Sequence, residues 1–168
     1  MNSLKRFLNT RLGFRLDGNE GYHRYLSAWV TRNCLGKRNL LVGPRWDSMG
    51  IPELVESGWI SIDPMRVNSQ YSTADRHYVA NLTYSKFHLY DHKVFNNIVI
   101  TRDIFKEPYL HYQTDYTRLI DNLLPMLTED GVIILASDNR YPIDHPSLRI
   151  IGSREVSKIT FVQLKRKC

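Results

Sequence analysis

The stretch NLLVGPRWDSMGIPELVESGWISIDP, residues 39–64, holds two short apolar runs within one compact unit. The first run, residues 40–42, stops at a Gly-Pro pair, and the second, residues 59–62, stops at an Asp-Pro pair. Apolar runs of this length between glycine and proline are typical of strands that a parallel sheet buries on both faces. The stretch therefore predicts a strand, a turn, a short helix and a second strand.

The glycine and the acid that end these runs, Gly43 and Asp63, stand 20 residues apart. Nucleotide-binding α/β folds place a carboxylate about 20 residues after a glycine turn, where it accepts hydrogen bonds from ribose hydroxyls. We therefore predict that Gly43 forms a cofactor turn and that Asp63 binds a ribose. The alternative is structural: Gly43 is a plain strand end, and Asp63 caps the proline turn that follows it.

The length of 168 residues suits a single domain, which we expect to have N-terminal helices over residues 1–35 and a sheet core over residues 36–168. The formal charge of +6 and the pI near 9.4 favour a polyanionic or phosphate-bearing partner such as a nucleic acid. The same charge also aids solubility, so it does not by itself identify a partner.

Only two cysteines are present, Cys34 and Cys168, so neither a disulfide framework nor a cysteine metal site is expected. This cysteine usage favours a reducing, cytoplasmic location. The longest apolar run, residues 132–136, is much shorter than the roughly 20 residues of a membrane span. The histidines lack the spacings of metal-binding helices, apart from His88 and His92 in an expected loop. We expect no metal and no membrane span.

Two helices are expected before the first strand. Residues 1–16 are basic and have apolar residues at helical spacing, which suits a transit segment, an arm for nucleic acid or membrane, or a first helix packed on the domain. We favour the packed helix. Residues 22–34 carry a second apolar stripe, which Leu35-Gly36 ends in the manner of a C-cap.

The remainder of the chain alternates between expected strands and helices. We expect an extended piece at 77–82 and a strand at 97–101. A helix follows, capped by Thr114 or Asp115, with apolar positions from Tyr116 to Leu127. After a turn at Asp130-Gly131, we expect a buried strand at 132–136 and an antiparallel pair of strands at 148–151 and 159–164. Alternating elements that end in a hairpin predict an α/β three-layer domain.

In order and spacing, the segments from residue 22 to the C-terminus resemble the class I S-adenosylmethionine-dependent methyltransferases. Residues 40–44 resemble the first strand and glycine turn of that family, and Ile62-Asp63 resembles the second strand with its ribose-binding acid. Residues 87–105 and 119–135 resemble the fourth and fifth strands with their flanking segments. The resemblance implies a Rossmann-like fold whose sheet is mostly parallel and has an antiparallel C-terminal strand.

The resemblance also implies S-adenosylmethionine as the cofactor and methyl transfer to an oxygen or nitrogen of a small-molecule or nucleic-acid acceptor. The implied cofactor-binding residues follow the first four strands: Gly43, Pro44, Arg45, Asp63, Asn81, Leu82 and Thr101. Asp103 follows a central strand, where open α/β sheets bind ligands, so it is a candidate to orient or deprotonate a substrate hydroxyl. Arg102 is a candidate to hold an anionic substrate.

Three departures from the family pattern stand out. Its first loop is usually Gly-x-Gly-x-Gly, yet here only Gly43 remains and residues 45–47 read Arg-Trp-Asp. Arg45 could contact a carboxylate itself, or its bulk could close the pocket. Asn96 stands where the family usually has an acid, and no Asn/Asp-Pro-Pro-Tyr element follows Ile100, which argues against the exocyclic amino group of a base as acceptor.

Three rival functions stand beside this prediction. The chain could be a catalytically inactive methyltransferase-fold module or subunit that binds nucleic acid. An enzyme using NAD is disfavoured, because no Gly-x-Gly-x-x-Gly follows the first strand. An RNA 2′-O-methyltransferase suits the positive charge, and the many tyrosines could stack bases or pack half-buried.

Overall fold

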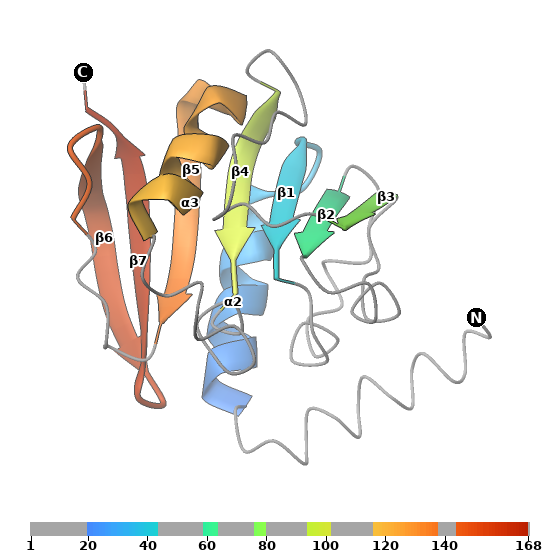
Figure 1. The fold of residues 1–168 in the computed structure, drawn as a ribbon. Helices are drawn as coiled ribbons and strands as arrows, with labels where there is room; N and C mark the ends of the chain where they lie inside the picture. The colour runs from blue at the N-terminus through green and yellow to red at the C-terminus, as the bar shows by residue number, and fades with distance from the viewer. Residues whose placement is uncertain are drawn as a thin grey trace.

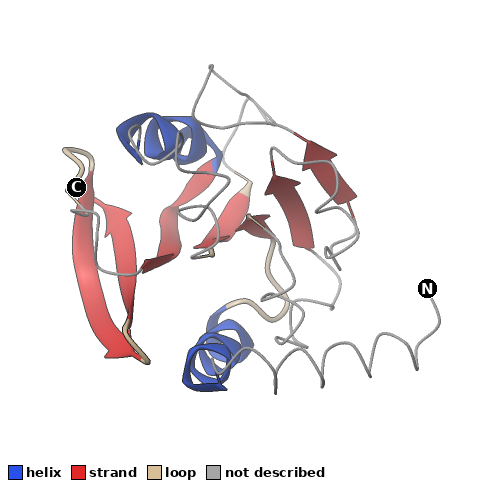
Figure 2. Ribbon diagram, turned by 60° about the horizontal axis from the view of Figure 1, so that its bottom comes forward, coloured by secondary structure: helices blue, strands red, loops and turns tan. Residues whose placement is uncertain are grey.

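The computed structural model of the protein describes residues 20–43, 59–63, 76–79, 94–101, 116–137 and 144–167. In these residues, a seven-stranded sheet lies between helix α2 on one face and helix α3 on the other (Figures 1 and 2). The elements are α2 (Glu20–Asn33), β1 (Asn39–Val42), β2 (Trp59–Asp63), β3 (Arg76–Val79), β4 (Phe95–Ile100), α3 (Tyr116–Leu123), the 3₁₀ turn η6 (Leu124–Met126), β5 (Leu127–Ser137), β6 (Leu148–Val156) and β7 (Ile159–Arg166).

The strand order across the sheet is β3-β2-β1-β4-β5-β7-β6. Strands β3, β2, β1, β4 and β5 pair in parallel, whereas β7 pairs antiparallel with both β5 and β6. The predicted three-layer α/β fold, mostly parallel with an antiparallel C-terminal strand, is therefore confirmed. The two apolar runs of residues 39–64 form the neighbouring parallel strands β1 and β2, as the sequence predicted.

The two faces of the sheet form two separate cores, because successive side chains of a strand point to opposite faces. Leu40 and Val42 of β1 join the core that contains Leu119, Ile120 and Leu123 of α3. Leu41 joins the other core, which contains the stripe predicted for α2: Tyr22, Leu26, Trp29 and Val30. Burial on both faces explains why β1 reads as a continuous apolar run rather than an alternating one.

The junction between α2 and β1 is held by buried asparagine side chains. Gly36 adopts φ +69° just after α2 ends, which confirms the predicted C-cap. Asn39 Nδ2 donates to the carbonyls of Cys34 and Lys37, both at 2.9 Å. Asn97 Nδ2 donates to Asn33 O at 3.0 Å and to Asn39 Oδ1 at 2.9 Å. This amide network ties the end of α2 to the starts of β1 and β4.

Two predictions for the segment from α3 to β5 are wrong. Leu127 was expected in a helix, but α3 ends at Leu123 and Leu127 begins β5. The reason is Pro125. Proline has no backbone N–H to donate within a helix, and its ring disfavours the helical conformation at the preceding residue. Residues 124–126 form a 3₁₀ turn instead.

The second error concerns Asp130-Gly131, which was expected to be a turn and lies inside β5. The pairing register between β4 and β5 shifts here: Phe95 pairs with Leu127 and Asn97 with Val132, so five steps along β5 match two along β4. Gly131 folds closely over Leu127, because a Cβ at Gly131 would lie 2.5 Å from Leu127 Cδ1. The turn signal therefore produces an irregular bulge within a strand rather than a break between elements.

Other predicted segments lie partly or wholly outside the described residues. The extended piece predicted at 77–82 is confirmed as far as Val79, the last residue of β3. The basic N-terminal segment, residues 1–16, lies outside the described part of the chain. In the described part, neither α2 nor α3 has the length and apolarity that a membrane crossing requires.

Candidate functional site

The candidate site lies at the carboxyl ends of β1, β2 and β4. The strand order reverses between β1 and β4, and open α/β sheets bind ligands at such a switch point. Val42 pairs with both Ile62 and Ile100, so the residues next along the three strands are Gly43, Asp63 and Thr101. Three of the residues predicted for cofactor binding are therefore brought together at one edge of the sheet.

Gly43 turns the chain out of β1. Its φ is +77°, a left-handed conformation that glycine adopts without steric cost. Its N–H donates to the carbonyl of Ile62 at 3.0 Å, which ties the turn to β2. The predicted glycine turn is thus present, and the residue beside it on β2 is the predicted ribose ligand.

Asp63 ends β2 with only 1% of its surface exposed. A carboxylate that is buried requires hydrogen-bond donors around it, and Asp63 already has an interaction within the protein. A carboxylate has about four acceptor positions, more than one interaction fills. Such a group, next to a left-handed glycine turn, suits a ligand that brings hydroxyl donors.

Thr101 follows β4 and is fully buried. Its hydroxyl donates to Gly43 O at 2.6 Å, and its N–H donates to Val42 O at 3.1 Å. The hydroxyl oxygen also lies 3.4 Å from Val42 O. Sequence reasoning selected Thr101 by its position after a strand but did not find this bond, because the two partners are 58 residues apart and no local pattern reveals it.

The other residues predicted for the site lie outside the described residues: Pro44, Arg45, Asn81, Leu82, Arg102 and Asp103. Four of them directly continue described strand ends, because Pro44 and Arg45 follow Gly43, and Arg102 and Asp103 follow Thr101. Their roles remain predictions.

A Ser–His pair lies between β2 and β3 and was not predicted. Ser61 and His77 are register partners, and Ser61 Oγ lies 2.7 Å from His77 Nδ1. Burial lowers the pKa of His77 below its ordinary value of 6.5, so the ring is neutral at pH 7. Because Ser61 is completely buried, the pair is inaccessible for nucleophilic chemistry and is a structural contact between β2 and the edge strand β3.

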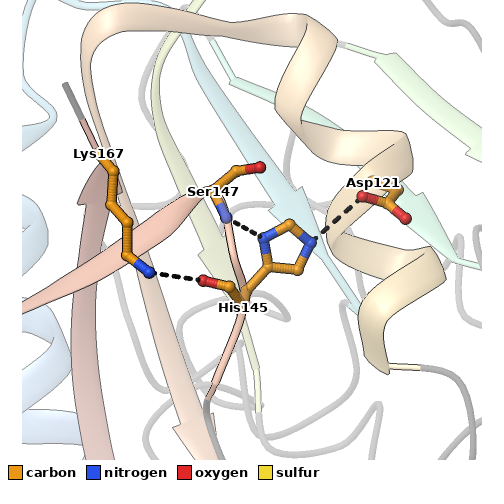
Figure 3. A network of polar contacts seen from close by, with 4 residues as sticks. All are labelled: Asp121, His145, Ser147 and Lys167. Carbon is orange, nitrogen blue, oxygen red and sulfur yellow. Dashed lines mark hydrogen bonds and ion pairs between the residues drawn. The ribbon is translucent and has the colours of Figure 1, made fainter.

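A second buried histidine, His145, lies just before the start of β6 (Figure 3). Its Nδ1 accepts a hydrogen bond from Ser147 N at 3.2 Å, so Nε2 carries the proton that points to Asp121 Oδ1, also at 3.2 Å. Lys167 Nζ donates to the carbonyl of His145 at 3.5 Å. This network joins α3, β6 and the end of β7 at the sheet edge opposite Gly43, and therefore lies away from the candidate site.

The described residues contain no group of three or more His, Cys, Asp or Glu side chains that could hold a metal ion. Cys34 is buried, and desolvation raises the pKa of its thiol to about 12 although nearby Lys37 acts in the opposite direction. A thiol with this pKa stays protonated at neutral pH and is a poor nucleophile. Among the described residues, the polar groups at the ends of β1, β2 and β4 are oxygen and backbone groups of Gly43, Asp63 and Thr101.

The amino-acid sequence matches no protein-family model and no curated protein at a significant level. Solved structures do match the fold. A TehB-like SAM-dependent methyltransferase from Corynebacterium glutamicum is 14% identical, and the match covers 99% of this chain and 100% of that chain with a TM-score of 0.64.

Two further matches have different named activities. Magnesium protoporphyrin IX methyltransferase (ChlM) from Synechocystis PCC 6803, solved with bound SAM, is 12% identical over 94% of this chain and 84% of that chain, with a TM-score of 0.59. The 16S rRNA methyltransferase RmtF, solved with S-adenosyl-L-homocysteine, is 10% identical over 96% and 74% of the two chains, with a TM-score of 0.55.

The chain therefore has the Rossmann-like fold of the class I SAM-dependent methyltransferases. The match extends over nearly the whole chain, including the antiparallel C-terminal strand that the resemblance implied. At identities of 10–14%, the similarity is one of fold.

Proposed function

We propose that the protein binds S-adenosylmethionine and transfers its methyl group to an oxygen or nitrogen acceptor. The observation that carries this proposal is the meeting of Gly43, Asp63 and Thr101 at the switch point of a methyltransferase-type sheet. The solved structures of this fold include proteins with bound SAM and bound S-adenosylhomocysteine.

The described residues suit the nucleoside part of this cofactor. Asp63 would accept hydrogen bonds from the two ribose hydroxyls, and the left-handed turn at Gly43 would let the ligand approach the backbone closely. Asn81 and Leu82, after β3, are proposed to contact the adenine. Pro44 has no N–H, so the first peptide of the turn offers no donor to the cofactor carboxylate. Arg45 is the nearest candidate in sequence for that contact.

On the acceptor side, the residues after β4 are proposed to act directly. The bound cofactor would supply an activated methyl group on a positively charged sulfonium. The task of the protein is then to align the acceptor and exclude water. Asp103 would take the proton from an attacking hydroxyl or amino group. Arg102 would hold an anionic part of the acceptor.

For the acceptor, the net charge of +6 favours a nucleic acid over a neutral small molecule. Among the fold matches, one protein is named for an rRNA substrate and another for a porphyrin, so the fold itself is compatible with either class. The rival is a catalytically inactive module of the same fold that binds nucleic acid. The loss of all but one glycine from the first loop favours this rival.

Calorimetry with S-adenosylmethionine and S-adenosylhomocysteine tests the proposal. Wild-type protein should bind both, and Asp63→Asn should weaken binding about tenfold or more, because a carboxylate becomes a neutral amide with one acceptor oxygen. The control is Asp121→Asn, which lies on the surface of α3 away from the site. If well-folded wild-type protein binds neither compound, the proposed methyltransferase activity is refuted. Salt-dependent RNA affinity in the same sample would then favour the inactive module.

If cofactor binding is found, transfer of a radiolabelled methyl group to capped and uncapped RNA tests the acceptor class. Labelled RNA would support a nucleic-acid acceptor. If the protein binds the cofactor but labels neither the capped nor the uncapped RNA, the result would point to a small-molecule acceptor.

A further inference from the structure

Thr101 donates two hydrogen bonds to consecutive carbonyls, that of Val42 at the end of the neighbouring strand β1 and that of Gly43 after it. Its backbone N–H donates to Val42 O at 3.1 Å, and its hydroxyl donates to Gly43 O at 2.6 Å. The first bond continues the β1–β4 pairing by one residue. The second depends entirely on the side chain, and it lies where no solvent reaches, because Thr101 is fully buried.

The Gly43–Pro44 peptide can accept a hydrogen bond but cannot donate one, since proline has no N–H. Its single polar group is the carbonyl of Gly43, which takes the hydroxyl proton of Thr101. The N–H of Gly43 is also engaged, with Ile62 O at 3.0 Å. The backbone groups of Gly43 are therefore bound on one side by β2 and on the other by the residue after β4.

Such restraint is needed because glycine adopts positive and negative φ about equally well. The φ of +77° at Gly43 is therefore one of several conformations open to this residue. A buried hydrogen bond to the next carbonyl selects this conformation over the others. In its absence, Gly43 O would be a buried acceptor with no donor in place, which is an unfavourable arrangement.

We infer that Thr101 is a positioning residue for the cofactor turn and acts on the cofactor through Gly43. The inference rests on the proposed function, because it adds a role within the same site. In this assignment, the Thr101 hydroxyl fixes the first peptide of a loop that lacks the additional glycines usual in the family. The turn is thereby held in one conformation before any ligand arrives.

Two substitutions separate the hydroxyl from the shape of the side chain. Thr101→Val replaces the hydroxyl by a methyl group of similar size, whereas Thr101→Ser keeps the hydroxyl and removes the methyl. The matched control is Val99→Ala, at a buried position of β4, the strand that Thr101 follows, whose side chain packs in the α2 core. This control lowers stability by a core truncation and leaves the bonds of Gly43 in place.

Two measurements are compared across the four proteins: amide hydrogen exchange of Gly43 without ligand, and the dissociation constant for S-adenosylhomocysteine. Thr101→Val should speed exchange at Gly43 and weaken binding, each by roughly tenfold, the factor that corresponds to about 1.4 kcal/mol. Thr101→Ser should leave both the exchange rate of Gly43 and the dissociation constant close to the wild-type values. Val99→Ala should change neither by more than about twofold once global stability is taken into account.

Unchanged Gly43 exchange and unchanged affinity in Thr101→Val would overturn the inference. Equal effects in Thr101→Val and Val99→Ala would also overturn it, since loss of stability alone would then explain the result. Failure of the proposed function gives a different pattern: wild-type protein would not bind S-adenosylhomocysteine, while Thr101→Val would still speed exchange at Gly43. That pattern would leave Thr101 as the restraint on the turn and refute cofactor binding.

Discussion

Replacing Asn39 tests how much the amide network at the start of β1 stabilises the fold. The Asn39 side chain is buried and makes three hydrogen bonds: two donated to the carbonyls of Cys34 and Lys37, and one accepted from Asn97. A buried hydrogen bond contributes about 1 kcal/mol net, so Asn39→Ala should lose about 3 kcal/mol. A loss of that size should lower Tm by about 6–12 °C in a chain of this length.

Asn39→Asp makes the same test sharper, because it preserves the shape of the side chain. The oxygen that keeps its place still accepts from Asn97, but the other oxygen now faces the two carbonyls to which Nδ2 donated. These carbonyls and the burial favour the protonated acid, so the folded-state pKa of the new carboxyl should exceed its unfolded value of about 3.9. A group of this kind destabilises more as pH rises. The stability difference from wild type should therefore be larger at pH 7 than at pH 4.5.

Urea unfolding followed by tryptophan fluorescence measures both effects, since Trp29 and Trp59 are buried in the core on the α2 side. The control is Asn96→Asp, in β4 next to Asn97, where the side-chain oxygen accepts a hydrogen bond from Arg38 N at 3.2 Å. An aspartate keeps that acceptor, so the change should stay within about 0.5 kcal/mol. A loss below 1 kcal/mol for Asn39→Ala, or equal losses for Asn39→Asp at the two pH values, would refute the reasoning.

Two further predictions concern stability. Because burial lowers the pKa of His77, the unfolded chain takes up a proton more readily than the folded one, so stability present above about pH 6.5 should decline as pH falls below it. His77→Asn, which keeps a hydrogen-bonding group for Ser61, should make urea midpoints less dependent on pH between 7 and 5; an unaltered slope would contradict this. Gly131→Ala should cost about 1–3 kcal/mol, because its Cβ would lie 2.5 Å from buried Leu127 and 3.0 Å from Thr128 O. Gly152→Ala is the comparison, since its nearest atom is the mobile end of Gln163 at 3.3 Å; equal losses for the two glycines would count against the close-packing argument.

The sequence revealed those parts of the fold that depend on local patterns. Strands β1, β4 and β5 are buried on both faces, so apolar runs marked them directly. The apolar stripe of α2 and its glycine cap were equally local. The end of α3 was misjudged because the 3.6-residue period continues to Leu127, whereas Pro125 ends the helix.

The candidate site was only partly accessible to the same reasoning. Gly43 and Asp63 were found from their spacing, and the structure brings them to adjacent strand ends. The Thr101–Gly43 hydrogen bond and the Ser61–His77 pair arise from the register of strands that are distant in sequence. No periodicity or motif within one segment encodes such a register, so these two contacts emerged only from the fold.

The network around His145 has a consequence for how this fold can change over evolution. The ring of His145 contacts Asp121 of α3, and the carbonyl of His145 accepts hydrogen bonds from Leu148 N and Lys167 Nζ. These contacts hold Leu148, the first residue of β6, through α3 and through residues on the β6 side of the connection from β5. Insertions and deletions in that connection should leave the register of the hairpin intact.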